Sequence, residues 1–189
     1  MKKINNKEFY EAAINKYGVS PRGVHWNSKN SQYKRFEAIT SFIKKDIVNS
    51  TLLDVGCGFG EYYKYLSINN KLPAKYIGID CEKSMIDLAN TRFPNQQFIV
   101  KDVLKNNLIH SDYLVCSGAL NILDIDQIDI FIKKCFEYCN KGFIFNFLKN
   151  VTFTIIKKDE IIDITKKYTK NMIIKEDYLD NDFTIFMVK

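Results

Sequence analysis

The sequence contains no run of apolar residues that approaches the roughly 20 needed to cross a lipid bilayer. Its polar start, Met1 to Asn6, lacks the apolar core of a secretory signal. We therefore expect a cytoplasmic protein without a membrane partner. Internal repeats, low-complexity stretches and linkers rich in proline or glycine are also absent, so we expect the 189 residues to form one domain, 1–189.

Cysteine and histidine are too few and too scattered to predict a metal centre. The chain has five cysteines, an odd number, and only two histidines. Cys135 and Cys139 would share one face of a helix, but a zinc site would need its other ligands from distant places. We expect no metal, and thiols that pack as small apolar side chains in a reducing compartment.

Arginine is scarce beside lysine, and no basic run is interleaved with aromatic residues as a platform for single-stranded nucleic acid requires. The formal net charge is +6. Lysine, asparagine and isoleucine are preferred throughout, however, as a compositional bias would make them. The charge alone therefore does not predict a nucleic-acid partner, and nothing in the sequence sets the oligomeric state.

From Thr51 onward, short apolar runs alternate with longer amphipathic stretches, the pattern of repeated βα units. We predict strands at 51–55, 76–80, 97–101, 113–117 and 142–147. A helix over 157–168 and two strands, 171–175 and 183–188, would follow, the strands being joined by a turn at 178–182. The predicted fold class is α/β: a Rossmann-like, doubly wound sheet of seven mostly parallel strands with a C-terminal antiparallel hairpin.

The first fifty residues are predicted to form a helical lid, 1–50, on a core formed by 51–189. Apolar side chains recur at helical spacing up to Tyr17, and an irregular polar and aromatic stretch follows. A second helix is then expected over 33–48.

The most specific motif is LLDVGCGFG, residues 52–60, in which an apolar strand ends near Asp54 and turns through three glycines into a helix. Gly56 and Gly58 permit backbone conformations and a close ligand approach that a Cβ would obstruct, and Gly60 lets the helix start press against the strand. The G-x-G-x-G spacing is one residue shorter at its end than the dinucleotide fingerprint that holds a pyrophosphate. It therefore favours a ligand without phosphate.

With this D-x-G-x-G-x-G motif, the sequence resembles the class I S-adenosylmethionine-dependent methyltransferases from about Thr51 to the C-terminus. The resemblance implies that S-adenosyl-L-methionine is the cofactor, that its methionine part lies along the glycine loop with Cys57, and that Asp54 helps to hold its amino group. Asp80 ends the second strand about 20 residues after the loop, the distance at which a carboxylate meets both ribose hydroxyls. The alternative role of Asp80 is a helix N-cap.

Further cofactor contacts that the resemblance implies follow the next strands. Cys81 and Met85 would flank the adenine. Asp102 would accept from the adenine amino group, with Val103 beside it, unless Asp102 is a plain loop residue. Ser117, at the end of the fourth strand, would face the methyl group.

The segment after the fourth strand departs from the Asn-Pro-Pro-Tyr/Phe motif of methyltransferases that act on exocyclic amines of bases or on glutamine amides, which disfavours those substrates. Gly118 would leave room for the substrate, and Asn121 would orient it or else cap the next helix.

In the lid, Trp26 is either a substrate contact or a core residue. Arg35 could bind the cofactor carboxylate, because a guanidinium grips a carboxylate with two hydrogen bonds.

Methyl transfer from a sulfonium is an in-line displacement with a neutral leaving group, so a dedicated catalytic residue is not required. If the acceptor must lose a proton, His25 is the candidate base, since its ordinary pKa lies near neutrality. The predicted substrate is a small molecule. Arg22, Lys29, Lys34 and Arg35 would favour an anionic one, although solvated surface charge explains three of these four residues equally well. The alternatives are an RNA or protein methyltransferase, and a non-catalytic protein that binds adenosyl or nicotinamide nucleotides.

Overall fold

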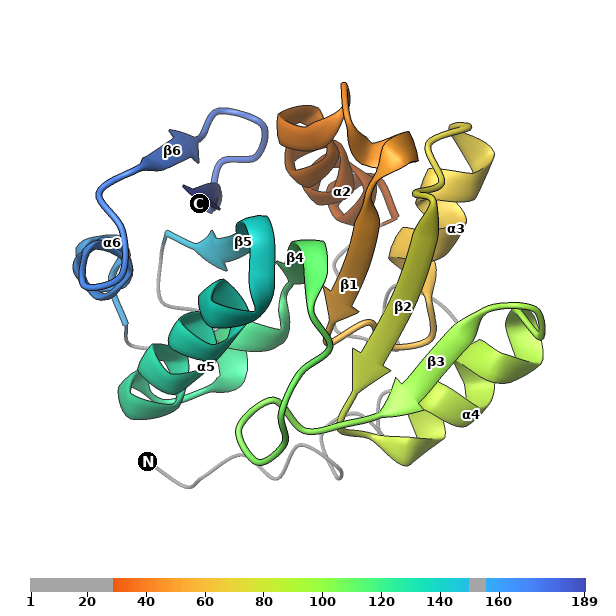
Figure 1. Cartoon of the computed structure of the whole chain (residues 1–189). Coiled ribbons are helices and arrows are strands. Elements are labelled where there is room, and N and C mark those ends of the chain that lie inside the picture. Colours follow the sequence, from red (N-terminus) through yellow and green to blue (C-terminus); the bar gives the residue numbers. More distant parts are fainter. Residues whose placement is uncertain (1–28, 150–155) are drawn as a thin grey trace.

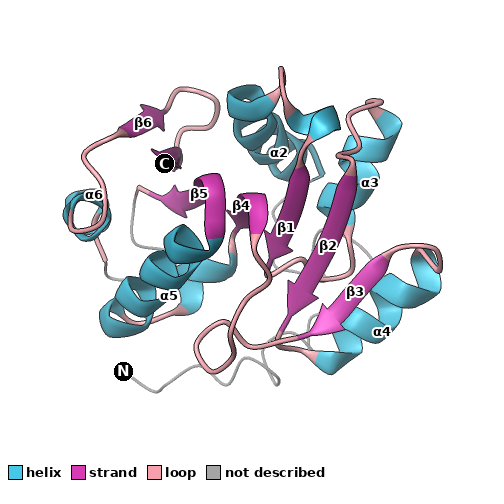
Figure 2. Cartoon of the chain, viewed as in Figure 1, coloured by secondary structure: helices cyan, strands magenta, loops and turns pink. Residues whose placement is uncertain are grey.

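The computed structural model describes residues 29–149 and 156–189, which form one sheet with helices on both faces (Figure 1). The strands are β1 (Thr51–Val55), β2 (Lys75–Asp80), β3 (Gln97–Val100), β4 (Ser111–Ser117), β5 (Cys139–Leu148), β6 (Met172–Lys175) and β7 (Asp182–Val188). The helices are α2 (Lys29–Ile43), α3 (Glu61–Ile68), α4 (Lys83–Arg92), α5 (Ile125–Tyr138) and α6 (Lys158–Lys166), with short 3-10 turns η2 (Ile47–Asn49) and η3 (Ala119–Ile122) (Figure 2). None of these helices is long and apolar enough to cross a membrane.

Within the described residues the sheet has seven strands in the order β3-β2-β1-β4-β5-β7-β6. The pairs among β1 to β5 are parallel, whereas β7 runs antiparallel to both β5 and β6. The predicted fold class is therefore confirmed. The chain winds outward from β1 to β3 and then returns to β4 on the other side of β1. In open α/β sheets, ligands bind at the carboxyl ends of the strands where the order reverses in this way.

The two faces of the sheet have separate apolar cores because side chains alternate along each strand. Phe143, Phe145 and Phe147 of β5 pack with residues of α5 and α6. Ile144, the intervening residue, packs with residues of α2, α3 and α4. Phe36 of α2 is 4% exposed. The helix α2 is thus part of the layer that covers this face, rather than a lid above it.

Most predicted elements are present, with shifted ends. The second strand begins at Lys75 and the fifth at Cys139, earlier than predicted, while the third ends at Val100. The predicted helix over 33–48 is α2, which starts at Lys29 and ends at Ile43, followed by η2. Of the predicted lid, residues 1–28 lie outside the described part of the chain.

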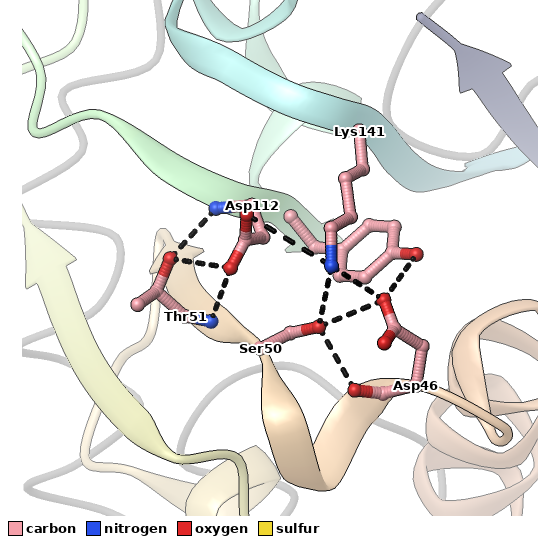
Figure 3. A network of polar contacts seen from close by, with 6 residues as sticks. Asp46, Ser50, Thr51, Asp112 and Lys141 are labelled. Carbon is pink, nitrogen blue, oxygen red and sulfur yellow. Dashed lines mark hydrogen bonds and ion pairs between the residues drawn. The ribbon is translucent and has the colours of Figure 1, made fainter.

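A polar network joins the amino ends of β1, β4 and β5 (Figure 3). Lys141 donates from Nζ to the Asp46 carboxylate at 2.7 Å and to Ser50 Oγ at 3.3 Å. Asp112 accepts from the backbone N–H of Thr51 at 2.8 Å and from its hydroxyl at 3.1 Å. This network lies at the edge of the sheet opposite the glycine loop, so its role is to hold the strand starts together.

Candidate cofactor and substrate site

The loop between β1 and α3 brings three elements close together at the carboxyl edge of the sheet. Gly56 has a φ of 74°, a value that favours glycine. The N–H groups of Gly56 and Cys57 donate to the carbonyl of Ile79, at 2.8 and 3.0 Å. A Cβ on Gly56 would lie 2.5 Å from the Cβ of Ala119 in η3. The glycine therefore allows the ends of β1 and β2 to meet η3.

Arg92, in the last turn of α4, holds the far end of the same loop. Its Nη1 donates to the carbonyl of Phe59 at 2.6 Å, and its Nη2 donates to the carboxylate of Glu61. The guanidinium lies 5.0 Å from the ring centres of both Phe59 and Phe93. Sequence analysis did not single out Arg92, although an arginine in a chain that prefers lysine was the available signal.

Asp80 ends β2 and turns its carboxylate toward the loop. Its Oδ2 accepts from the backbone N–H of Gly58 and its Oδ1 from that of Glu82, both at 2.9 Å. Burial raises the pKa of Asp80 to about 6, and the bonds from Glu82 and Gly58 oppose this rise. The N-cap of α4 is Glu82, so the alternative role of Asp80 as a cap is not observed. Each carboxylate oxygen retains capacity for another donor.

Asp54 lies below the loop and is 3% exposed. The hydroxyl of Tyr76, on the neighbouring strand β2, donates to its Oδ2 at 2.5 Å. Burial raises the pKa of Asp54 to about 7, an effect that the bond from Tyr76 opposes and the nearby charge of Asp80 increases. Tyr76 was not anticipated from the sequence, because its contact with Asp54 depends on the register of two strands.

The residues expected around an adenine follow β2 and β3. Met85 and Val103 are buried, whereas Cys81 is exposed. Partial desolvation of the Cys81 thiol, together with the nearby charges of Asp80 and Glu82, raises its pKa to about 12, so the thiol stays protonated at neutral pH. Asp102 accepts from the N–H of Leu104 at 2.9 Å and pairs with Lys105. Asp102 thus bonds within its own loop, and its carboxylate is partly exposed.

The end of β4 leads into η3 through Gly118, which has a φ of 93°. Asn121 is 7% exposed. Its Nδ2 donates to the carbonyl of Gly118 at 3.2 Å, and its Oδ1 accepts from the N–H of Leu148 at 3.2 Å. Both ends of this amide are therefore bonded to backbone, so Asn121 fixes η3 against β5 rather than orienting a substrate.

The guanidinium group of Arg35 binds a carboxylate of the protein rather than facing a ligand site. Its Nε donates to Oδ1 of Asp182 at 2.5 Å and its Nη2 to Oδ2 at 2.7 Å, and both side chains are buried. The predicted grip on a cofactor carboxylate is replaced by an ion pair that joins α2 to β7. The other two candidates from the predicted lid, His25 and Trp26, lie outside the described residues.

A further polar group at this edge involves residues that sequence analysis missed. The hydroxyl of Ser117 donates to Oδ1 of Asn146 on β5 at 2.8 Å. The Nδ2 of Asn146 donates to Thr184 Oγ1 at 2.7 Å and to the Tyr178 hydroxyl at 3.3 Å. Buried polar residues at consecutive strand ends were the available signal, but their pairing depends on the order of strands in the sheet.

Residues 52–142 match the family model described as Methyltransferase domain. A protein of Invertebrate iridescent virus 6 is 35% identical over 88 residues, which cover 44% of this chain and 33% of that protein. The carboxy-S-adenosyl-L-methionine synthase of Staphylococcus epidermidis is 27% identical over 135 residues, covering 69% and 59%. The chain thus spans from a third to about three fifths of the length of these curated relatives.

Solved structures show the same fold. The N-methyltransferase NodS from Bradyrhizobium japonicum, in complex with S-adenosyl-L-homocysteine, superposes with a TM-score of 0.73 at 13% identity, covering 97% of each chain. Magnesium protoporphyrin IX methyltransferase from Synechocystis, with bound S-adenosylmethionine, gives a TM-score of 0.71 at 13% identity, covering 100% of this chain and 99% of the other. The fold and site define an α/β protein with a Rossmann-like methyltransferase topology. Residues 52–142 are thus similar to a methyltransferase domain, and the chain has the fold of the class I S-adenosylmethionine-dependent methyltransferases.

Proposed function

We propose that this chain is a single methyltransferase domain that transfers a methyl group from S-adenosylmethionine to a small molecule. The observation that carries the proposal is the pairing of the glycine loop with Asp80. The loop N–H of Gly58 and the Asp80 carboxylate meet at 2.9 Å, at the carboxyl ends of β1 and β2. The match of residues 52–142 to the methyltransferase-domain model and the strand order support the same conclusion.

The residues present fit this cofactor. Gly56 and Gly58 have positive φ values, 74° and 52°, so the loop turns sharply at the carboxyl edge of the sheet, where its backbone can approach a ligand. Asp80 is only partly exposed and can accept two further hydrogen bonds, as a ribose diol requires. Met85 and Val103 are buried apolar residues that follow β2 and β3, and the adenine ring would lie against this part of the chain.

When bound, S-adenosylmethionine would supply an electrophilic methyl group on a sulfonium. The role of the chain is then mainly to position the reactants, because in-line displacement depends on alignment. Asp80 would fix the ribose, and the loop from Gly56 to Gly60 would hold the methionine part. Gly118 would leave room for the acceptor at the end of β4. If the acceptor must lose a proton, we propose His25 as the base.

Support for an anionic acceptor is weaker in the structure than in the sequence. Arg35 is paired with Asp182, and the Nζ of Lys29 lies 5.2 Å from the ring centre of Tyr33. Lys34 is exposed on α2. The proposal therefore specifies a small acceptor and does not rest on an anionic one.

Calorimetric titration of Asp80→Asn with S-adenosylhomocysteine tests this proposal. We expect binding to weaken at least about 30-fold, equivalent to about 2 kcal/mol, because the charged acceptor of the ribose hydroxyls is lost. The matched control is Asp87→Asn, on the adjoining helix α4, where the aspartate is exposed and pairs with Lys83. Equal affinity in wild type and Asp80→Asn would contradict the proposed site.

A further inference from the structure

Polar residues occupy one face of the sheet where β4 and β5 end and β7 begins. Val115, Ile144 and Phe186 belong to the core that packs against α2 and α3. Residues two positions along a strand share a face. The polar residues on this face are therefore Ser117, Asn146, Thr184 and Asp182, which we call the β5-edge cluster. Three of its members, all except Ser117, are at most 3% exposed.

The hydrogen bonds of the β5-edge cluster run in one direction and end at Tyr178. Ser117 donates to Asn146, which donates to Thr184 and to the hydroxyl of Tyr178. Thr184 in turn donates from Oγ1 to the same hydroxyl at 2.8 Å. The Tyr178 oxygen is thus two hydrogen bonds away from Ser117, the residue at the end of β4.

The Tyr178 hydroxyl accepts both of these bonds, which leaves its own proton to be donated. Among residues 29–149 and 156–189, the structure shows no acceptor for that proton. Burial raises the pKa of Tyr178 to about 12, so the phenol keeps its proton at neutral pH. Tyr178 is therefore a hydrogen-bond donor that is oriented by its neighbours and ready for a ligand.

Gln32 provides a buried acceptor on the facing helix. It precedes Arg35 by three positions on α2, so the two side chains share a helix face, and Arg35 contacts Asp182 of the β5-edge cluster. Gln32 is 2% exposed, and its Oε1 has no hydrogen-bond partner among residues 29–149 and 156–189. Buried carbonyl oxygens are almost always bonded. The amide oxygen of Gln32 is thus free to accept a hydrogen bond from a bound ligand.

Within the described part of the chain, the two basic side chains nearest this edge each have a carboxylate partner. Arg35 forms its ion pair with Asp182, and the Nζ of Lys149 lies 3.5 Å from the Glu176 carboxylate. The remaining groups of the β5-edge cluster are neutral hydroxyls and an amide. A charged ligand placed here would lose its hydration without gaining a counter-ion, which is unfavourable.

We propose that Tyr178 and Gln32 line the subsite for the methyl acceptor, and that this acceptor carries an uncharged polar group able both to accept and to donate a hydrogen bond, such as a carboxamide. This inference rests on the proposed function, in which the acceptor lies at the end of β4, where Ser117 is also located. The recognised group is separate from the atom that takes the methyl, because a hydrogen bond from Tyr178 to that atom would make it a poorer nucleophile.

Benzamide and benzoate are a matched pair of probes, since they have nearly the same shape and differ in charge. We would titrate each into the complex of the full chain with S-adenosylhomocysteine and follow carbon-13-labelled tyrosine rings by NMR, assigning Tyr178 with Tyr178→Phe. Benzamide should shift the Tyr178 signal in a saturable way. Benzoate should bind at least about tenfold more weakly, because its charge would be desolvated without a partner.

Tyr178→Phe should weaken benzamide binding by about five- to tenfold, the usual effect of one hydrogen bond, and leave the affinity for S-adenosylhomocysteine unchanged. Tyr168→Phe is the control, because the Tyr168 hydroxyl bonds to Asp129 of α5, on the other face of the sheet. No saturable benzamide shift, equal binding of benzoate, or equal benzamide affinity in Tyr178→Phe would overturn the inference. Failure of the wild type to bind S-adenosylhomocysteine would instead refute the proposed function, and benzamide titration of the ligand-free chain would still test the subsite.

Discussion

Replacement of Asp54 by asparagine should stabilise the ligand-free protein, although Asp54 is part of the candidate site. Burial raises the pKa of Asp54 from its ordinary value of 3.8 to about 7. At neutral and higher pH the fold must therefore hold an ionised carboxylate in surroundings that disfavour the charge. Asparagine has nearly the same shape and can still accept the hydrogen bond from Tyr76 through its amide oxygen.

The size of the effect follows from the pKa of Asp54. Asp54 has a higher pKa in the folded chain than in the unfolded chain. The folded state therefore loses stability as the pH rises from the pKa of the unfolded chain to that of the folded chain. The span from 3.8 to about 7 corresponds to about 4 kcal/mol above pH 7. At pH 5 only about 1.6 kcal/mol of this loss has occurred. The advantage of Asp54→Asn should thus grow by about 2 to 3 kcal/mol between pH 5 and pH 8.

Urea unfolding of the wild type and Asp54→Asn at pH 5 and pH 8, followed by circular dichroism, measures this difference. Asp87→Asn again serves as the control, because Asp87 is exposed and its replacement should change the free energy of unfolding little at either pH. The reasoning is refuted if Asp54→Asn is no more stable than the wild type at pH 8, or if its advantage is the same at both pH values.

Three further outcomes can be checked with the same protein. Wild-type affinity for S-adenosylhomocysteine should be about tenfold weaker at pH 5 than at pH 8 in calorimetry, because Asp80, with a pKa of about 6, is then mostly protonated; a flat profile would contradict this. Gly56→Ala should lower Tm and abolish binding of the same ligand, because the new Cβ would lie 2.5 Å from the Cβ of Ala119. Adding Ala119→Gly removes that second Cβ and should restore part of both the Tm and the binding; no restoration would show that the contact with η3 is unimportant. Lys141→Met should lower Tm without changing the Kd for S-adenosylhomocysteine, since its network lies at the opposite edge; a weakened Kd would argue against that separation.

Local patterns were sufficient to predict the order of elements. The apolar run at 51–55, followed by three glycines and an amphipathic stretch, predicts a strand, a loop and a helix in that order, and the structure has all three. The final antiparallel pair was predicted for the same reason, because a turn-like stretch separates two strand-length runs. Element ends were less accurate, as at Cys139, where β5 follows α5 directly without a loop.

Side-chain partners could not be predicted, because they depend on which strands become neighbours. Arg35 and Asp182 are 147 positions apart and meet only because α2 packs beside β7. The amide of Asn121 could bind a ligand, yet the fold places it beside the end of β5, where it bonds to backbone. Tyr178 lies in a stretch that reads only as a turn. Its contact with Asn146 follows from the pairing of β5 with β7.

Binding of an adenosyl ligand at the glycine loop is tested most directly by calorimetric titration of the wild-type chain with S-adenosylmethionine, S-adenosylhomocysteine and NAD. The carboxylate of Asp80 predicts that the two adenosyl ligands bind, and the short glycine spacing predicts that NAD does not. Binding of NAD alone, or of none of the three, would contradict the assignment of this loop to S-adenosylmethionine.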